Sequence, residues 1–208
     1  MKIKDITLPI KEKMIYYPGD AHFKKEPICT IAKSGCNMTK ITLSTHTGTH
    51  LDAPFHFLSE GKSIDELPLD TFVGKAQVIE VKKEKIDAQE IEKHLLADIK
   101  RILFKTKNSF LLDKDEFSKD YVYLTEDGAD FLIEKGVSLV GIDYISIEKF
   151  GTPTFSVHKK LFSKNIPILE GLYLKNVDPG IYFLVALPLP LSGLDGSPVR
   201  AILIEDMF

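Results

Sequence analysis

The chain has 208 residues, of which 44% are hydrophobic and 27% are charged. These proportions are close to those of soluble globular proteins, and they exclude a disordered, collagen-like or coiled-coil chain. The 27 Lys and Arg against 30 Asp and Glu give a net charge of -3, with basic residues dispersed among acidic ones, so we expect no nucleic-acid partner. The length, without an internal repeat or a long linker, predicts one domain over residues 1–208.

The apolar stretches, the first residues and the cysteines of the sequence indicate the cellular location that we expect. No stretch approaches the roughly 18 apolar residues of a membrane span, and residues 1–5 lead into no signal-peptide core. We therefore expect a cytoplasmic protein without a membrane partner. Cys29 and Cys36 are too few for a disulfide framework and lack the paired spacing of a zinc knuckle, so we expect them to be reduced and structural.

Short runs rich in Val, Ile, Tyr, Phe and Thr recur between Gly, Pro, Asp and Asn residues, a pattern typical of strands. The predicted strands are 29–32, 38–44, 73–81, 102–104, 121–124, 138–142, 182–186 and 199–204.

Three helices are predicted between these strands. Asp87, followed three residues later by Glu90, indicates a capping box before a short amphipathic helix. Thr125 is a suitable N-cap for a second helix that Gly136 ends, and the third covers residues 154–162. Because helices and strands do not alternate regularly, we expect a β-rich α/β domain with a mixed sheet or a partly closed barrel.

Half of the six histidines lie in residues 44–57, with the sequence STHTGTHLDAPFHF. A run of β-branched residues precedes this stretch, and Gly48 and Pro54 then interrupt regular structure, so we expect its polar side chains on a loop beyond a strand end. Imidazole and carboxylate are the usual ligands of Zn²⁺ and related ions, and a site needs three or more of them at one point. The candidate ligands are His46, His50 and Asp52.

The same stretch resembles the recurring motif H-x-G-T-H-x-D-x-P-x-H of the cyclase-like metal-dependent hydrolases, which include the bacterial kynurenine formamidases and isatin hydrolases. The motif is complete over residues 46–56. Further features similar to the family are Pro18-Gly19-Asp20, His158 followed twelve residues later by Glu170, and residues 193–200.

The resemblance implies a swivelling β/β/α fold, assembly as homodimers or homotetramers, and two divalent metal ions per subunit, with zinc expected first and manganese as the alternative. The ligands that it implies are His46, His50 and Asp52 for the first ion, and Asp52, His158 and Glu170 for the second. It implies that His56 is the catalytic acid/base. The alternative is that His56 is a further metal ligand, and spacing alone does not separate the two roles.

The implied activity is hydrolysis of a carbon–nitrogen bond other than a peptide bond in a small molecule, most nearly an aryl formamide of the N-formylkynurenine type, in tryptophan catabolism. Metal ions lower the pKa of bound water from about 15.7 towards about 7, and an imidazole can carry a proton to the leaving nitrogen. The alternatives are opening of a cyclic amide, imide or lactone, as in isatin hydrolysis, and a metal-binding protein without turnover.

Two further positions bear on the substrate. Tyr17 takes the place at which formamidases carry a tryptophan that stacks on the aromatic substrate, and a tyrosine offers a π face and a hydroxyl. The alternative is that Tyr17 packs a turn with Pro18. Residues 193–198 predict a turn-rich loop near the site, and we expect Arg200 to pair with a carboxylate of a neighbouring strand or subunit rather than with an acidic substrate.

Overall fold

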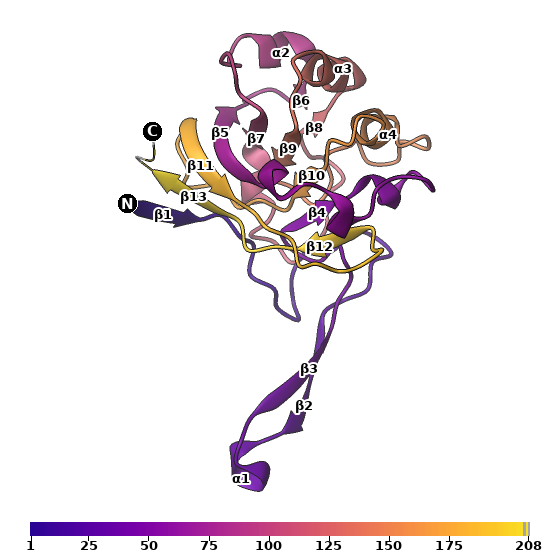
Figure 1. The fold of residues 1–208 in the computed structure, drawn as a ribbon, viewed down its shortest axis with the longest axis vertical. Helices are drawn as coiled ribbons and strands as arrows, with labels where there is room; N and C mark the ends of the chain where they lie inside the picture. The colour runs from indigo at the N-terminus through magenta and orange to yellow at the C-terminus, as the bar shows by residue number, and fades with distance from the viewer. Residues whose placement is uncertain (206, 208) are drawn as a thin grey trace.

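The strands of the computed structural model pair into one large sheet and two short ribbons, and the model describes residues 1–205 and 207 (Figure 1). The strands are β1 (Lys2–Asp5), β2 (Lys24–Cys29), β3 (Met38–Thr42), β4 (His50–Asp52), β5 (Val73–Glu80), β6 (Lys85–Ile86), β7 (Arg101–Lys105), β8 (Tyr123–Leu124), β9 (Leu139–Ile142), β10 (Ile168–Glu170), β11 (Gly180–Val185), β12 (Gly196–Pro198) and β13 (Ile202–Glu205). The helices are α1 (Ile31–Ser34), α2 (Ala88–Glu92), α3 (Glu126–Glu134) and α4 (Ser156–Phe162).

The large sheet has the order β1-β13-β11-β5-β7-β9-β10-β4-β12. Its centre, from β5 to β10, is parallel, and the strands on both flanks pair antiparallel. The sheet curls, with α2, α3 and α4 on its outer face (Figure 1). This is the β-rich α/β fold with a mixed, partly closed sheet that the sequence predicted.

Each face of the sheet buries its own core because side chains alternate along a strand. On β7, Ile102 and Phe104 face the core beneath the helices, and Leu103 faces the core inside the curl. The same alternation on β10 places Ile168 beneath the helices and Leu169 inside the curl. The outer face therefore lies under the helices, and polar side chains on it are shielded from water.

The predicted helix ends are largely confirmed. The Asp87 side chain accepts the Glu90 N–H at 2.9 Å, and Thr125 accepts the Gly128 N–H at 3.3 Å. Gly136 has the left-handed φ of 65° expected of a helix stop. The third helix begins at Ser156 rather than at residue 154, because Phe155 adopts a left-handed φ of 49° that a helix cannot continue.

Two expectations were wrong. The predicted strand 29–32 ends at Cys29, and the residues after it form the short helix α1. The motif was expected on a loop, which holds for His46, but His50–Asp52 form strand β4 between β10 and β12. The sequence gives no strand signal for β4, because the strand has only three residues and two of them are polar. Those two side chains face the candidate site rather than solvent.

Residues 24–42, which we call the arm, extend away from the rest of the molecule (Figure 1). The arm consists of β2 and β3, paired antiparallel, with α1 at its tip. Both cysteines lie there as free thiols with their Sγ atoms 3.4 Å apart, so they belong to the tip and not to a core.

None of the described helices is long and apolar enough to cross a membrane.

Candidate metal centre

Strand geometry brings the motif residues to one face of the sheet. His50 and Asp52 alternate with Leu51, which lies in the core inside the curl, so both polar side chains face the helix side. The antiparallel register of β4 and β10 sets His50 directly opposite Glu170. Helix α4 covers this face and contributes His158. Four polar side chains that are distant in sequence, each at most 4% exposed, therefore meet beneath α4.

The distances among these four side chains suit a shared cation. His50 Nε2 lies 3.2 Å from Asp52 Oδ1 and 3.7 Å from Glu170 Oε2. His158 Nε2 lies 3.5 Å from Glu170 Oε1 and 4.0 Å from Asp52 Oδ2. Two ligand atoms each about 2.0–2.2 Å from one ion lie about 3–4 Å apart. The donor set and its spacing therefore fit a divalent metal ion.

His46 also contacts Asp52, at the same carboxylate oxygen as His50. Its Nδ1 lies 2.7 Å from Asp52 Oδ1, a direct hydrogen-bond distance, and its ring lies 4.0 Å from the ring of His56 between centroids. The potential ligand atoms of His46, Asp52 and His56 all lie within 4.8 Å of one another, as do those of His50, Asp52 and Glu170. Asp52 is thus common to two groups of potential ligands.

Two glycines allow the backbone to approach the candidate ligands closely. Gly196 on β12 pairs with Asp52, and a Cβ there would lie 3.1 Å from Cε1 of His46. A Cβ on Gly171, which has φ of 69°, would lie 2.3 Å from the Gly48 carbonyl oxygen. The motif loop therefore packs directly against the end of β10 with no room for a side chain at that contact.

Two carboxylates that sequence reasoning did not single out hold the histidines. Asp195 Oδ2 lies 2.8 Å from His46 Nε2 and 3.5 Å from His56 Nδ1. Glu148 Oε2 lies 2.7 Å from His158 Nδ1. The sequence contains only weak signals that these two carboxylates belong to the site. Asp195 lies in the predicted turn-rich loop, and Glu148 follows the largely apolar residues after β9.

Charge pairing shifts the histidine pKa values. Burial alone would lower the pKa of His46, but Asp52 and Asp195 outweigh it and raise that pKa to about 10. Burial is likewise outweighed at His158, where Glu148 and Glu170 raise the pKa to about 9. At Asp52 burial opposes ionisation, yet His46 and His50 hold the pKa of this carboxyl well below its usual range. In contrast, burial lowers the pKa of His56.

The site opens into a cavity of about 360 Å³. All six candidate histidine and carboxylate residues line it, together with Tyr17, Asp20, Phe57 and Phe155. Phe57 stacks on Phe155 with ring centroids 4.6 Å apart, which gives the cavity an aromatic wall. Tyr17 lines the cavity and packs edge-on against Phe117 at 5.3 Å, and its carbonyl accepts the Asp20 N–H at 3.0 Å across the turn that contains Pro18.

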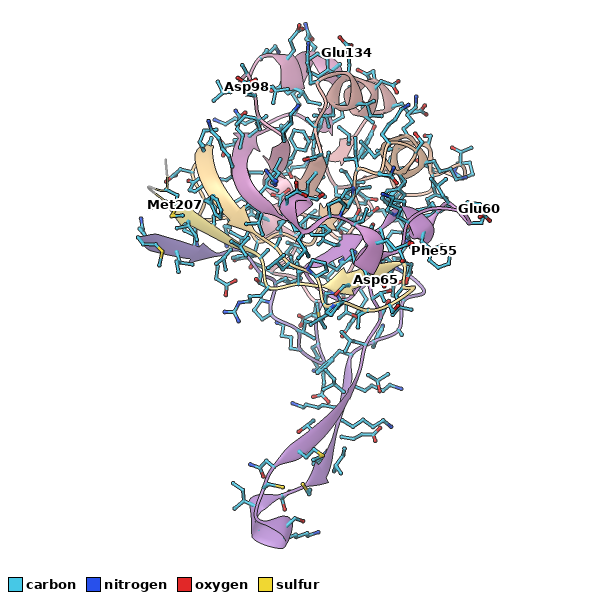
Figure 2. All side chains as sticks on the ribbon, in the orientation of Figure 1. Phe55, Glu60, Asp65, Asp98, Glu134 and Met207 are labelled. Atoms are coloured by element: carbon cyan, nitrogen blue, oxygen red, sulfur yellow. The ribbon has the colours of Figure 1, made fainter. Side chains whose placement is uncertain are left out.

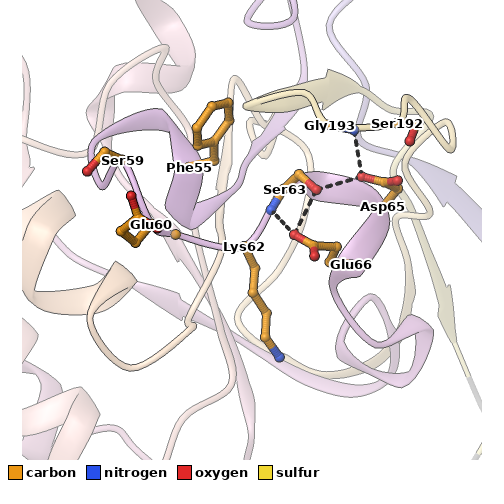
Figure 3. A pocket seen from close by; sticks show the side chains of 10 residues that line it. Phe55, Ser59, Glu60, Lys62, Ser63, Asp65, Glu66, Ser192 and Gly193 are labelled. Carbon is orange, nitrogen blue, oxygen red and sulfur yellow. Dashed lines mark hydrogen bonds between the residues drawn. The ribbon is translucent and has the colours of Figure 1, made fainter.

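A second hollow of about 510 Å³ lies beside Phe55 (Figure 3). Two of its acidic side chains are already engaged: Asp65 accepts from the Ser63 hydroxyl at 2.7 Å and from the Gly193 N–H at 3.0 Å, and Glu66 accepts the Ser63 N–H at 2.8 Å. These contacts join two loops and give the hollow a structural role.

Arg200 forms an ion pair with Asp5, the role expected for it.

Comparison with known proteins finds similar sequences and similar structures over most of the chain. The family model described as "Putative cyclase" matches residues 4–149. Kynurenine formamidase of Bacillus thuringiensis (strain Al Hakam) is 41% identical over 96% of this chain and 95% of its own, and that of Bacillus anthracis is 40% identical over the same shares. A solved structure described as a potential metal-dependent hydrolase with cyclase activity superposes with a TM-score of 0.85 and 36% identity, covering 97% of this chain and 96% of the other. Isatin hydrolase A from Labrenzia aggregata shares the fold, with a TM-score of 0.84 and 24% identity over 97% and 93% of the two chains.

Proposed function

This chain belongs to the cyclase family, and we propose on that basis that it is a metal-dependent hydrolase that cleaves the carbon–nitrogen bond of an aryl formamide of the N-formylkynurenine type, in tryptophan catabolism. The observation that carries the proposal is the position of Asp52, which is buried and common to two groups of potential ligands, one with His46 and His56 and the other with His50 and Glu170. The kynurenine formamidases that match nearly the whole chain support the substrate class.

The proposed ligands are His46, His50 and Asp52 for one ion, and Asp52, His158 and Glu170 for a second. Zinc is the first choice and manganese the alternative, because imidazole and carboxylate ligands suit both. When bound, such ions would lower the pKa of water and polarise the formyl carbonyl. Both oxygens of Asp52 lie near a histidine, Oδ1 at 3.2 Å from His50 and Oδ2 at 4.0 Å from His158, and this supports a bridging role.

His56 is the proposed acid/base. Burial lowers its pKa, so the imidazole is neutral at pH 7 and can accept a proton from the attacking water. The oxygen of that water bonds to the formyl carbon, the carbon–nitrogen bond breaks, and His56 returns the proton to the leaving nitrogen. The products are formate and an aryl amine. Asp195, 3.5 Å from Nδ1 of His56, would orient the ring and stabilise its protonated form.

Tyr17 and the pair of Phe57 and Phe155 are proposed to hold the aromatic part of the substrate. They line the same cavity as the ligand cluster and offer flat apolar faces. A single domain over residues 1–208, a homodimer or homotetramer and a cytoplasmic location complete the proposal.

The test combines metal analysis of the purified protein with assays on N-formylkynurenine and isatin, before and after chelation and after zinc or manganese is restored. We expect formamide cleavage that disappears with the metal and returns with it. Isatin opening alone would identify a cyclic amide as the substrate instead, and bound metal without turnover of either compound would contradict the proposed substrate.

The Asp52→Asn variant should lose metal and activity together. The control variant Asp98→Asn, which alters the exposed surface near α2, should lose neither (Figure 2).

A further inference from the structure

One carboxylate at the wall of the cavity has no partner. Asp20 lines the cavity, but its side chain forms no hydrogen bond or ion pair with any residue that the structure describes. Only its backbone is bonded, through the N–H that donates to the Tyr17 carbonyl at 3.0 Å. The turn that contains Pro18 and Gly19 therefore fixes the position of Asp20, and its carboxylate is free to bind another group.

The other carboxylates that line the cavity are already engaged. Asp52 lies 2.7 Å from His46, and Glu170 accepts the Ile147 N–H at 2.8 Å. Asp20 belongs to neither of the two groups of potential metal ligands that share Asp52. The proposed metal ligands are thus complete without Asp20, and this carboxylate is available for a different role.

The surroundings of Asp20 favour a positively charged ligand. Burial raises the pKa of its carboxyl, and the negative charges of Asp52 and Glu170 act in the same direction, against His46 and His50. A carboxylate that is partly removed from water is costly unless an opposite charge or a hydrogen-bond donor faces it. None of the described residues that line the cavity is a Lys or an Arg. A cation that enters with the ligand would supply the missing partner.

We propose that Asp20 is a specificity-determining residue that binds a protonated amino group of the substrate, so that the site prefers aryl formamides that carry an ammonium group. The inference rests on the proposed function, because N-formylkynurenine has such a group on the chain next to its ring. Tyr17 and Asp20 lie at the two ends of one turn and both line the cavity. A ring that stacks on Tyr17 can therefore direct its ammonium substituent to Asp20.

The same cavity offers nothing comparable to the carboxylate of N-formylkynurenine. With no Lys or Arg among its described lining residues, the cavity has no fixed cation outside the metal centre and its histidines. The ammonium group is consequently the charged part of the substrate that the site recognises, and the carboxylate of the substrate should contribute little to binding.

Four formamides test the proposal on the metal-loaded protein. N-formylkynurenine and its decarboxylated analogue N-formylkynuramine carry the ammonium group, formanilide carries no charge, and N-formylanthranilate carries only a carboxylate. Asp20→Asn should raise KM for the two ammonium compounds by about 10–100-fold, the usual effect of losing a hydrogen bond to a charged group, and should change kcat less. Both constants for formanilide should stay close to those of the wild type, and KM for N-formylanthranilate should decrease because a repulsive charge is removed.

Two further variants are the controls. Glu12→Gln removes the same charge from an exposed residue of the same segment that does not line the cavity, and it should change none of the four reactions. Asp20→Glu keeps the charge and should retain most of the preference for the ammonium compounds. Equal losses with formanilide and N-formylkynuramine would overturn the proposal, because Asp20 would then act on the turn or the reaction rather than on the ammonium group. Loss of metal from Asp20→Asn would also overturn it.

A binding measurement separates this inference from the proposed activity. Calorimetry should show that kynuramine, which keeps the ammonium group but has no formyl group, binds the wild type more tightly than ortho-aminoacetophenone, which lacks the ammonium group. Asp20→Asn should remove this difference, whereas a difference that persists in the variant would overturn the role of Asp20 whether or not formamides are cleaved. Absence of turnover with all four formamides would instead contradict the proposed function.

Discussion

The carboxylate of Glu148 lies 2.7 Å from Nδ1 of His158, and Nε2 of the same ring is turned towards Asp52 and Glu170. Glu148 is only 4% exposed and also accepts the backbone N–H groups of Val157, at 3.2 Å, and His158, at 3.4 Å. One buried carboxylate thus holds both the first turn of α4 and the ring that α4 carries. Carboxylates that accept a hydrogen bond from a metal-binding histidine fix its tautomer and raise its basicity.

Glu148→Gln should weaken metal binding by about 10–100-fold, the usual effect of removing such a partner. Titration of the chelated protein with zinc, in competition with an indicator, measures this affinity directly. Glu126→Gln is the matched control, because Glu126 also accepts a hydrogen bond from α4, from Ser156 at 2.8 Å, but lies on the exposed surface. Equal affinities in all three proteins would mean that Glu148 only holds the helix.

His56→Ala should lower turnover by about 10²–10⁴-fold, the range for loss of an acid/base group. Metal content should stay close to that of the wild type, because the other five polar residues remain. Metal analysis and turnover are measured on the same preparation, with His94→Ala, which alters an exposed histidine just after α2, as the control. Loss of metal from the His56 variant would instead identify it as a ligand, the alternative that its spacing left open.

The stability of the chelated protein should decrease as the pH rises above 6.5. The folded pKa values of His46, about 10, and His158, about 9, lie above the ordinary value of 6.5. The folded chain therefore holds these protons more tightly than the unfolded chain, so their contribution is complete below pH 6.5 and is lost as the pH passes through about 9 and about 10. Thermal melts across this range measure the decline.

Metal loading should change that pH dependence. Histidine binds a metal as the neutral ring, so binding releases these protons, and apparent affinity should increase with pH over the same range. Melts of the zinc-loaded protein should consequently decline less between pH 6.5 and 9 than those of the chelated protein. A chelated protein whose Tm increases over this range would contradict the pairing of His46 and His158 with buried carboxylates.

Tyr17→Ala should raise KM for the aromatic substrate by about tenfold, which corresponds to the upper end of the roughly 0.5–1.5 kcal/mol of one well-placed aromatic contact, and should change kcat less. Tyr17→Phe keeps the ring and its packing on Phe117, so its KM should stay close to that of the wild type if stacking is what matters. A large effect of the Phe variant would indicate that the hydroxyl binds the substrate. Circular dichroism of both variants checks that the turn still packs.

The elements that sequence predicted well are those whose signals are local. The cap of α3 at Thr125 and the apolar run of β7 depend on a few consecutive residues, and both appear where expected. The six candidate site residues also share one cavity, because the motif supplies four of them within eleven residues. Glu148 and Asp195 were not singled out because they reach the histidines only through long-range strand pairing and loop packing, which no local pattern records.

Strand β4 has only three residues, yet its neighbours β10 and β12 fix its register on both sides. Since side chains on a strand alternate between faces, a single residue inserted or deleted between His50 and Asp52 would turn one of these side chains into the apolar core. The spacing of one residue between His50 and Asp52 is therefore required for both side chains to lie on the same face of the sheet. Substitutions at Leu51 that preserve its size should be tolerated, whereas any change in chain length within β4 should abolish the cluster.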